Sequence, residues 1–140
     1  AQLTRPAGRT RSAGAGTGWG ETVAKKVMLV DDDRTLTGLM KTLLELDGFN
    51  VSIEAQVAQV PVQVHAQQPD VVIMDVHLAD GDGLARLRQL RADPATQSLP
   101  IIMASGMDLE DQCLDAGATA FVLKPYPPDQ LTETIQKALS

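Results

Sequence analysis

The sequence predicts a three-layer α/β domain in which helices cover both faces of a mostly parallel, five-stranded sheet. Two features predict this class. Five short apolar runs recur along the chain, and the stretches between them carry apolar residues at helical spacing. The runs are almost continuously apolar, which is typical of parallel strands buried on both faces. Right-handed connections between such strands make the sheet doubly wound.

The five predicted strands all lie beyond residue 25. Aromatic residues make up only 3% of the chain, so Val, Leu, Ile, Ala and Met must fill the core around the strands. In chain order, the runs are KVMLV at 26–30, NVSI at 50–53, DVVIM at 70–74, PIIMA at 100–104 and AFVL at 120–123.

Helices are predicted between these strands and after the last one. Four segments carry apolar stripes: Leu36, Leu39, Met40 and Leu43; Leu84, Leu87 and Leu90; Leu109, Cys113 and Ala116; Leu131, Ile135 and Leu139. Its place in a stripe makes Cys113 a small core residue and not a reactive thiol. The segment 56–68 is less regular because Pro61 interrupts it, although proline is accepted in the first turn of a helix.

Length and composition indicate one folded domain preceded by a tail. The 140 residues are 44% hydrophobic and 21% charged, within the range of globular domains. Residues 1–24 are rich in Gly, Ala, Thr, Arg and Ser and lack apolar periodicity. We therefore expect a flexible tail or linker over 1–24 and a folded domain over 25–140.

The predicted folded part is acidic. Arg5, Arg9 and Arg11 against Glu21 give the first 24 residues a charge of +2, so the total of −6 leaves −8 for the rest. An acidic body argues against non-specific nucleic-acid binding, which needs a basic face. The single cysteine excludes an internal disulfide, and no apolar run is long enough for a membrane helix or a secretory signal. We expect a cytoplasmic protein without membrane attachment or direct nucleic-acid binding.

A polar residue follows each of the five predicted strands, but Glu54, after the second, is assigned no role. The residues after the other four strands are the candidates for a site. They are Asp31, Asp32 and Asp33 after the first, Asp75 after the third, Ser105 after the fourth and Lys124 after the fifth. In doubly wound sheets ligands bind at the carboxyl ends of the strands, so we expect these side chains to meet at one edge.

This group of side chains suits phosphoryl transfer with a divalent metal. Clustered carboxylates raise one another's pKa unless a cation lies between them, and Mg²⁺ prefers oxygen ligands. A carboxylate can also attack phosphorus, while Lys124 and Ser105 contact the phosphoryl oxygens. Asp33 is predicted to cap the helix that follows it.

Residues 26–139 resemble the receiver domain of bacterial two-component response regulators. The segments VMLVDDD, PDVVIMDVHLADGDGL, PIIMAS and DAGATAFVLKPY carry the resemblance. It implies a flavodoxin-like (βα)5 fold with strand order 2-1-3-4-5. It also implies a phosphoacceptor switch, in which Asp75 takes a phosphoryl group from a histidine kinase or a histidine phosphotransfer protein.

The resemblance assigns a role to each residue of the site. Asp31, Asp32 and Asp75, with the main-chain carbonyl of His77, align with the ligands of Mg²⁺ or Mn²⁺. Three further positions align with the residues that contact the phosphoryl group or switch on activation: Ser105, Lys124 and Phe121. The peptide between Lys124 and Pro125 aligns with one that is usually cis, and Gly83 fits the tight turn before the third helix.

The chain also departs from the family pattern. The family commonly has proline four residues after the phosphoacceptor, where this chain has Ala79. His77 and Met107 occupy variable positions that influence phosphate lifetime in the family, and their identities predict no lifetime here.

The family implies partners as well as chemistry. The surface of the fourth helix, fifth strand and fifth helix would change on phosphorylation and control an effector protein or domain, with a phosphorylation-dependent homodimer as a further option. Self-phosphorylation and hydrolysis of the aspartyl phosphate would be the only activities. A stand-alone receiver and a fragment of a longer regulator or hybrid kinase both stay open, as do the cognate kinase and the output.

Two alternatives start from the same aspartates. DDDRTLTG also matches the first motif of haloacid-dehalogenase-type phosphatases, with Asp31 as nucleophile and Asp33 as acid/base. That family expects another acidic motif after its lysine, where this chain has one short helical segment. A flavodoxin-like nucleotide or flavin binder would need a phosphate-binding loop after the first strand, and three aspartates would repel phosphate there.

Overall fold

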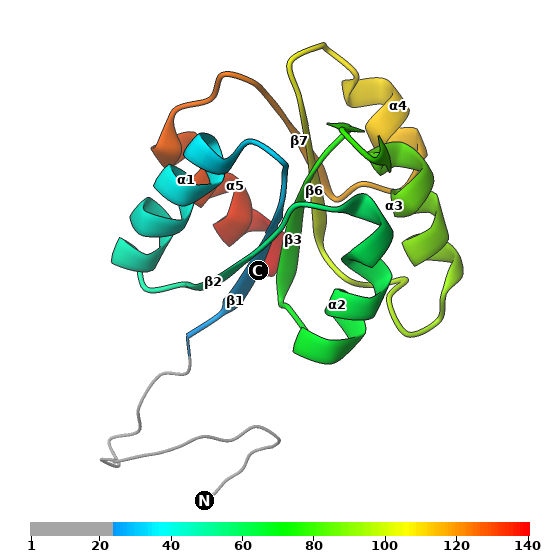
Figure 1. Ribbon diagram of the computed structural model, residues 1–140, viewed down its shortest axis with the longest axis horizontal. Coiled ribbons are helices and arrows are strands. Elements are labelled where there is room, and N and C mark those ends of the chain that lie inside the picture. Colours follow the sequence, from blue (N-terminus) through cyan, green and yellow to red (C-terminus); the bar gives the residue numbers. More distant parts are fainter. Residues whose placement is uncertain (1–23) are drawn as a thin grey trace, which may run out of the picture.

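A five-stranded parallel sheet forms the middle layer of the structure, a computed structural model that describes residues 24–140 (Figure 1). Its strands are β1 (Lys26–Val30), β2 (Asn50–Glu54), β3 (Val71–Asp75), β6 (Ile101–Ser105) and β7 (Ala120–Leu123). They lie in the order β2-β1-β3-β6-β7, and all neighbouring pairs are parallel. The predicted fold class and strand order are confirmed.

Helices cover both faces of this sheet (Figure 1). One face carries α1 (Arg34–Leu46) and α5 (Pro128–Leu139), and the other carries α2 (Val60–Gln67), α3 (Gly83–Ala92) and α4 (Glu110–Asp115). Each face has its own apolar cluster. In β1, for example, Val27 and Leu29 join one cluster while Met28 and Val30 join the other. Burial on both faces explains the continuous apolar runs.

The buried face of α1 differs from the predicted stripe. Leu39 is 53% exposed, whereas Thr37, Met40 and Leu44 are buried. The prediction was therefore wrong for Leu39. The buried face of α1 is centred on Thr37, Met40 and Leu44, and Leu39 lies outside it. A polar residue can be buried there because the Thr37 hydroxyl donates a hydrogen bond to the carbonyl of Asp33 at 3.0 Å.

The segment around Pro61 forms a 3-10 turn followed by a helix. The turn η2 (Val57–Gln59) leads directly into α2, and Pro61 lies in the first turn of α2. Val57, Val60 and Val64 are buried on the core side. Elsewhere in the core, Cys113 of α4 is fully buried, as its apolar spacing predicted.

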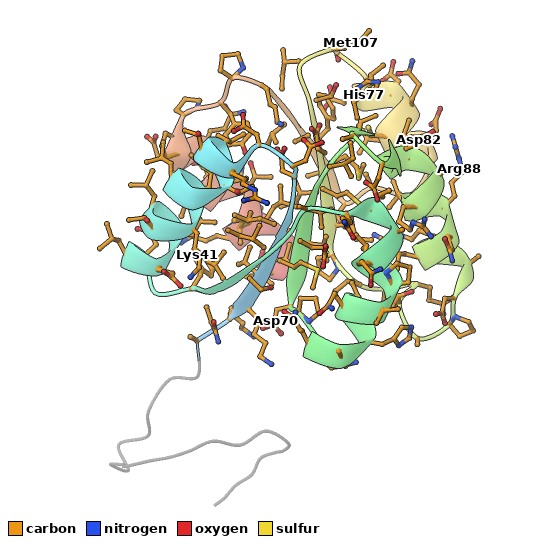
Figure 2. The ribbon with its side chains drawn as sticks, viewed as in Figure 1. Lys41, Asp70, His77, Asp82, Arg88 and Met107 are labelled. Carbon is orange, nitrogen blue, oxygen red and sulfur yellow. The ribbon has the colours of Figure 1, made fainter. Side chains whose placement is uncertain are left out.

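A two-stranded hairpin between β3 and α3 was not predicted. It consists of β4 (His77–Leu78) and β5 (Gly81–Asp82), which pair antiparallel. The hairpin lies at the carboxyl end of the sheet: in Figure 2, His77, Asp82 and Met107 lie toward one end, and Asp70, just before β3, lies at the other.

The tail predicted over 1–24 lies outside the described residues, except for its last residue. Over residues 24–140, the helices are all too short or too polar to cross a membrane.

Candidate functional site

Three of the predicted residues meet at the carboxyl edge of the sheet. Asp31 follows β1, Asp75 ends β3 and Lys124 follows β7. The Lys124 Nζ donates to Asp31 Oδ2 at 2.6 Å and to Asp75 Oδ2 at 3.3 Å. All three side chains are largely buried, with exposed fractions between 11% and 21%. The ammonium therefore lies between two carboxylates in a partly desolvated setting.

The charges in this group are not fully balanced. Burial raises the pKa of Asp75, the Lys124 charge opposes this, and the Asp31 charge raises the pKa further. The result is a pKa above the ordinary value of an aspartate. Burial alone would lower the pKa of Lys124, but the hydrogen bond and charge of Asp31, with the charge of Asp75, raise it. Two carboxylates sharing one ammonium leave negative charge that a second cation could neutralise.

The three consecutive aspartates have three different partners. Asp31 pairs with Lys124, and its Oδ1 also accepts from the main-chain N–H of Asp33 at 3.0 Å. The Asp33 Oδ1 accepts from Leu36 N–H at 3.0 Å, so Asp33 is the N-cap of α1, as predicted. The Asp32 carboxylate is exposed, and its Oδ2 accepts from Ala79 N–H at 2.7 Å.

These residues suit a hard divalent cation in their donor atoms. Within residues 24–140, no group of three or more His, Cys, Asp or Glu side chains lies in a metal-binding arrangement. Asp31 and Asp75 meet, whereas Asp32 is bonded to Ala79 on the hairpin. The donors are oxygens, which Mg²⁺ prefers. Burial, the first cause, and the charge of Asp31 raise the pKa of Asp75, so a cation beside it would stabilise its ionised form. The set therefore fits Mg²⁺ if Asp32 turns toward the other two.

Ser105 lies in β6 and Phe121 in β7, and Ser105 contacts the site through its main-chain carbonyl, which accepts from Lys124 N–H at 2.8 Å. Ser105 ends β6 and is fully buried, and its Oγ accepts from Met107 N–H at 3.0 Å. Phe121 lies in β7, is partly buried and packs on the α2–α4 side of the sheet. The Lys124–Pro125 peptide is cis.

The backbone after Asp75 is held by close contacts. The main chain of His77 makes a hydrogen bond that lowers the pKa of Asp75, against the larger effect of burial, and the His77 imidazole is exposed. At Gly83, the first residue of α3, an added Cβ would lie 2.2 Å from the Asp75 carbonyl oxygen. Only glycine allows this approach, which agrees with the tight turn predicted there.

Two residues of this region were missed from the sequence. Tyr126 lines a small cavity with Asp31 and Asp75, and burial raises its pKa. Asp80 accepts from the N–H groups of Val57 at 2.9 Å and Ala58 at 3.3 Å, which fixes the hairpin to η2. Tyr126 comes three residues after Leu123, the end of β7. It could have been found by searching a few residues further past each strand end for site residues. Asp80 could not, because its partners lie in η2, 22 and 23 residues earlier in the chain.

The sequence of this chain is similar to those of known proteins. Residues 27–136 match the family model of the response regulator receiver domain. The chain is 31% identical over 122 residues to the chemotaxis protein CheY of Bacillus subtilis, covering 84% of this chain and 100% of that protein. It is 32% identical over 114 residues to the transcriptional regulatory protein KdpE of Staphylococcus aureus, covering 79% of this chain and 48% of that protein.

Other curated relatives are longer still, and solved structures share the fold. The chain spans 26% of the transcriptional regulatory protein ZraR of Salmonella typhimurium, with 33% identity over 115 residues. A CheY-like receiver domain protein of Methanospirillum hungatei has a TM-score of 0.77 and 27% identity, covering 84% of this chain and 94% of that one. The receiver domain of a Pseudomonas aeruginosa sensor histidine kinase, with a magnesium ion in its active site cleft, has a TM-score of 0.76 and 25% identity, covering 84% and 98%.

Proposed function

This chain belongs to the response regulator receiver domain family and is a phosphoacceptor of two-component signalling, and we propose that Asp75 is the residue that accepts the phosphoryl group. The observation that supports this most is the place of Asp75 at the end of β3, where its carboxylate meets Lys124 and Asp31. Asp31 has the same ammonium at 2.6 Å, so the closer ion pair leaves Asp75 the less engaged carboxylate of the two.

The proposed reaction forms one bond and breaks another. A carboxylate oxygen of Asp75 attacks the phosphorus of a phosphohistidine on a histidine kinase or histidine phosphotransfer protein. The phosphorus–nitrogen bond breaks, and the departing imidazole keeps the electron pair and takes up a proton from solvent. Lys124 stays within reach of the new phosphoryl oxygens and offsets part of their charge.

The proposed metal ligands are Asp31, Asp32, Asp75 and the main-chain carbonyl of His77. The relative from Pseudomonas aeruginosa, which holds magnesium in its active site cleft, supports Mg²⁺ as the cofactor, and Mn²⁺ has the same ligand preference. A bound Mg²⁺ would supply positive charge to the oxygens of the transferring group. Asp31 already contacts Lys124, so the carboxylate of this chain that has to move is Asp32.

The proposed switch uses Ser105 and Phe121. The Ser105 hydroxyl would leave Met107 N–H and donate to the phosphoryl group, and Phe121 would then pack further inward. Leu114 of α4 and Leu123 of β7 are 44% and 47% exposed, so the surface of α4, β7 and α5 offers apolar side chains to an effector or to a second copy of the chain. Phosphorylation would change the affinity of this surface for that partner.

The position of Asp33 argues against the phosphatase alternative, in which Asp33 is the general acid/base. For a phosphatase, Asp33 would have to face the phosphoryl group, but its carboxylate caps α1 through Leu36 N–H. The match to the receiver domain family over residues 27–136 supports the receiver instead.

The proposal is tested with acetyl phosphate, a small phosphoryl donor, with and without Mg²⁺. Intact mass spectrometry should show the gain of one phosphoryl group that requires Mg²⁺, decays with time and is absent from Asp75→Asn. The exposed Glu133→Gln variant is the control and should be modified like the native protein. Unchanged modification of Asp75→Asn would refute the assignment.

A further inference from the structure

Asp32 is held apart from the carboxylates with which it is proposed to bind a metal. Its Oδ2 accepts a hydrogen bond from Ala79 N–H at 2.7 Å, across 47 residues of chain. Asp31 and Asp75, in contrast, meet at Lys124 and line the same small cavity, and Asp32 does not line that cavity. The hydrogen bond to Ala79 is thus the contact that fixes Asp32 on the hairpin side of the site.

The donor of this hydrogen bond belongs to an anchored segment. Ala79 lies in the turn between β4 and β5, the two strands of the hairpin. Leu78 of β4, the residue before it, pairs with Gly81 of β5. Leu78 is buried in the core on one side, and the Asp80 carboxylate is bonded to Val57 N–H and Ala58 N–H on the other. Figure 2 shows His77 and Asp82, the outer pair of this hairpin, at the carboxyl end of the sheet. Because both flanks are fixed, the Ala79 N–H does not readily follow Asp32 when that side chain turns.

We propose that the Ala79 N–H is a positioning group that competes with Mg²⁺ for the Asp32 carboxylate and so weakens metal binding; this rests on the proposed function, in which Asp32 is a metal ligand. A hydrogen bond to a charged acceptor is among the stronger ones in proteins. In this proposal, turning the Asp32 side chain toward Asp31 and Asp75 takes its Oδ2 out of reach of the anchored Ala79 N–H, and the measured Mg²⁺ affinity is reduced by the strength of the lost hydrogen bond.

The identity of residue 79 therefore controls the affinity. Every amino acid except proline supplies a main-chain N–H at this position. Proline removes the competitor and leaves all of the proposed ligands in place. A change that only damaged the hairpin would weaken metal binding, so a gain in affinity separates competition from structural damage.

The test compares Ala79→Pro with Ala79→Ser, which keeps the N–H. Isothermal titration calorimetry should give a Kd for Mg²⁺ about tenfold lower in Ala79→Pro, and a Kd in Ala79→Ser close to that of the native protein. Equal or weaker binding by a folded Ala79→Pro, checked by circular dichroism, would overturn the inference.

A second measurement on the native protein covers the case in which Ala79→Pro does not fold. Amide hydrogen exchange followed by NMR should show that Ala79 N–H exchanges faster when Mg²⁺ is saturating. Unchanged protection of this amide would also overturn the inference. Failure of the proposed function looks different: Asp32→Ala would then bind Mg²⁺ as well as the native protein does.

Discussion

Lys124 connects the two acidic residues of the site, and its position decides which of them is better neutralised. Its ammonium is 2.6 Å from Asp31 and 3.3 Å from Asp75. That the strand ends would meet was predictable from topology alone. The unequal pairing was not, because it depends on side-chain rotamers that the spacing of residues does not specify.

The raised pKa of Asp75 gives a pH-dependent prediction. Burial is its main cause, so the folded state binds a proton more tightly than the unfolded one, whose pKa is near 3.8. Stability is therefore lost as pH rises from about that value through the folded-state pKa, and the ionised carboxylate is a cost at pH 7. Without metal, Asp75→Asn should therefore raise the Tm at pH 7, because the neutral amide avoids the cost of burying a charge.

Thermal unfolding in chelator measures this effect. The advantage of Asp75→Asn should disappear at pH 3, where the native Asp75 is protonated in both states. The exposed Glu133→Gln variant, which removes one negative charge from α5, is the control for the loss of a charge. An Asp75→Asn variant that is less stable than the native protein at pH 7 would contradict the charge balance described here.

Gly83 is predicted to be intolerant of any side chain. A Cβ there would lie 2.2 Å from the Asp75 carbonyl oxygen and 3.1 Å from the Val76 Cα, both of them backbone atoms. Gly83→Ala should therefore lower the free energy of unfolding by about 1–3 kcal/mol. Gly38, within α1, is the matched control, because a Cβ added there would meet no atom within 4 Å beyond the neighbouring backbone of its own helix. Gly38→Ala should add about 0.5–1 kcal/mol to the free energy of unfolding. Equal effects in urea denaturation would contradict the close approach at Gly83.

At the scale of elements, α1 shows where apolar spacing is informative and where it is not. The spacing predicted the helix, but Leu39 is exposed and Leu44 is fully buried. The stripe could not reveal this, because the buried face includes Thr37, whose hydroxyl is bonded within the helix. The hairpin β4–β5 was missed for a related reason: two-residue strands carry no periodic pattern.

The burial pattern of α1 gives a second stability prediction. Leu44→Ala should lower the free energy of unfolding by about 2–5 kcal/mol, since it leaves a cavity in the α1–α5 core. Leu39→Ala should change it by no more than about 0.5 kcal/mol. Urea denaturation of both variants measures the difference, and a reversed order would contradict the orientation of α1.

Two aspartates in the loop between β1 and α1 have different proposed roles: Asp33 caps α1, and Asp32 binds the metal. Asp33→Ala should cost about 1 kcal/mol by removing the N-cap of α1, without changing the stabilisation by Mg²⁺. Asp32→Ala should abolish most of that stabilisation, which for the native protein is about 2.7 kcal/mol at a metal concentration of 100 Kd. Differential scanning fluorimetry over a Mg²⁺ titration distinguishes the two, and equal losses would refute the assigned pair.

At the scale of the whole molecule, the sequence was most informative about topology. Alternating apolar runs and helical stripes predicted the sheet and the edge at which Asp31, Asp75 and Lys124 meet, and the resemblance to receiver domains implied the strand order. Contacts between loops could not be predicted from the sequence. The hydrogen bond between Asp32 and Ala79 N–H, for example, depends on the path of the hairpin.

The location of the acyl phosphate tests the central claim most directly. After reaction with acetyl phosphate and Mg²⁺, borohydride reduction converts an aspartyl phosphate to homoserine, which tandem mass spectrometry locates on the chain. We predict homoserine at position 75 and an unmodified residue at 31 in the native protein. Homoserine at position 31, persisting in Asp75→Asn, would contradict the assignment of Asp75 as the phosphoacceptor.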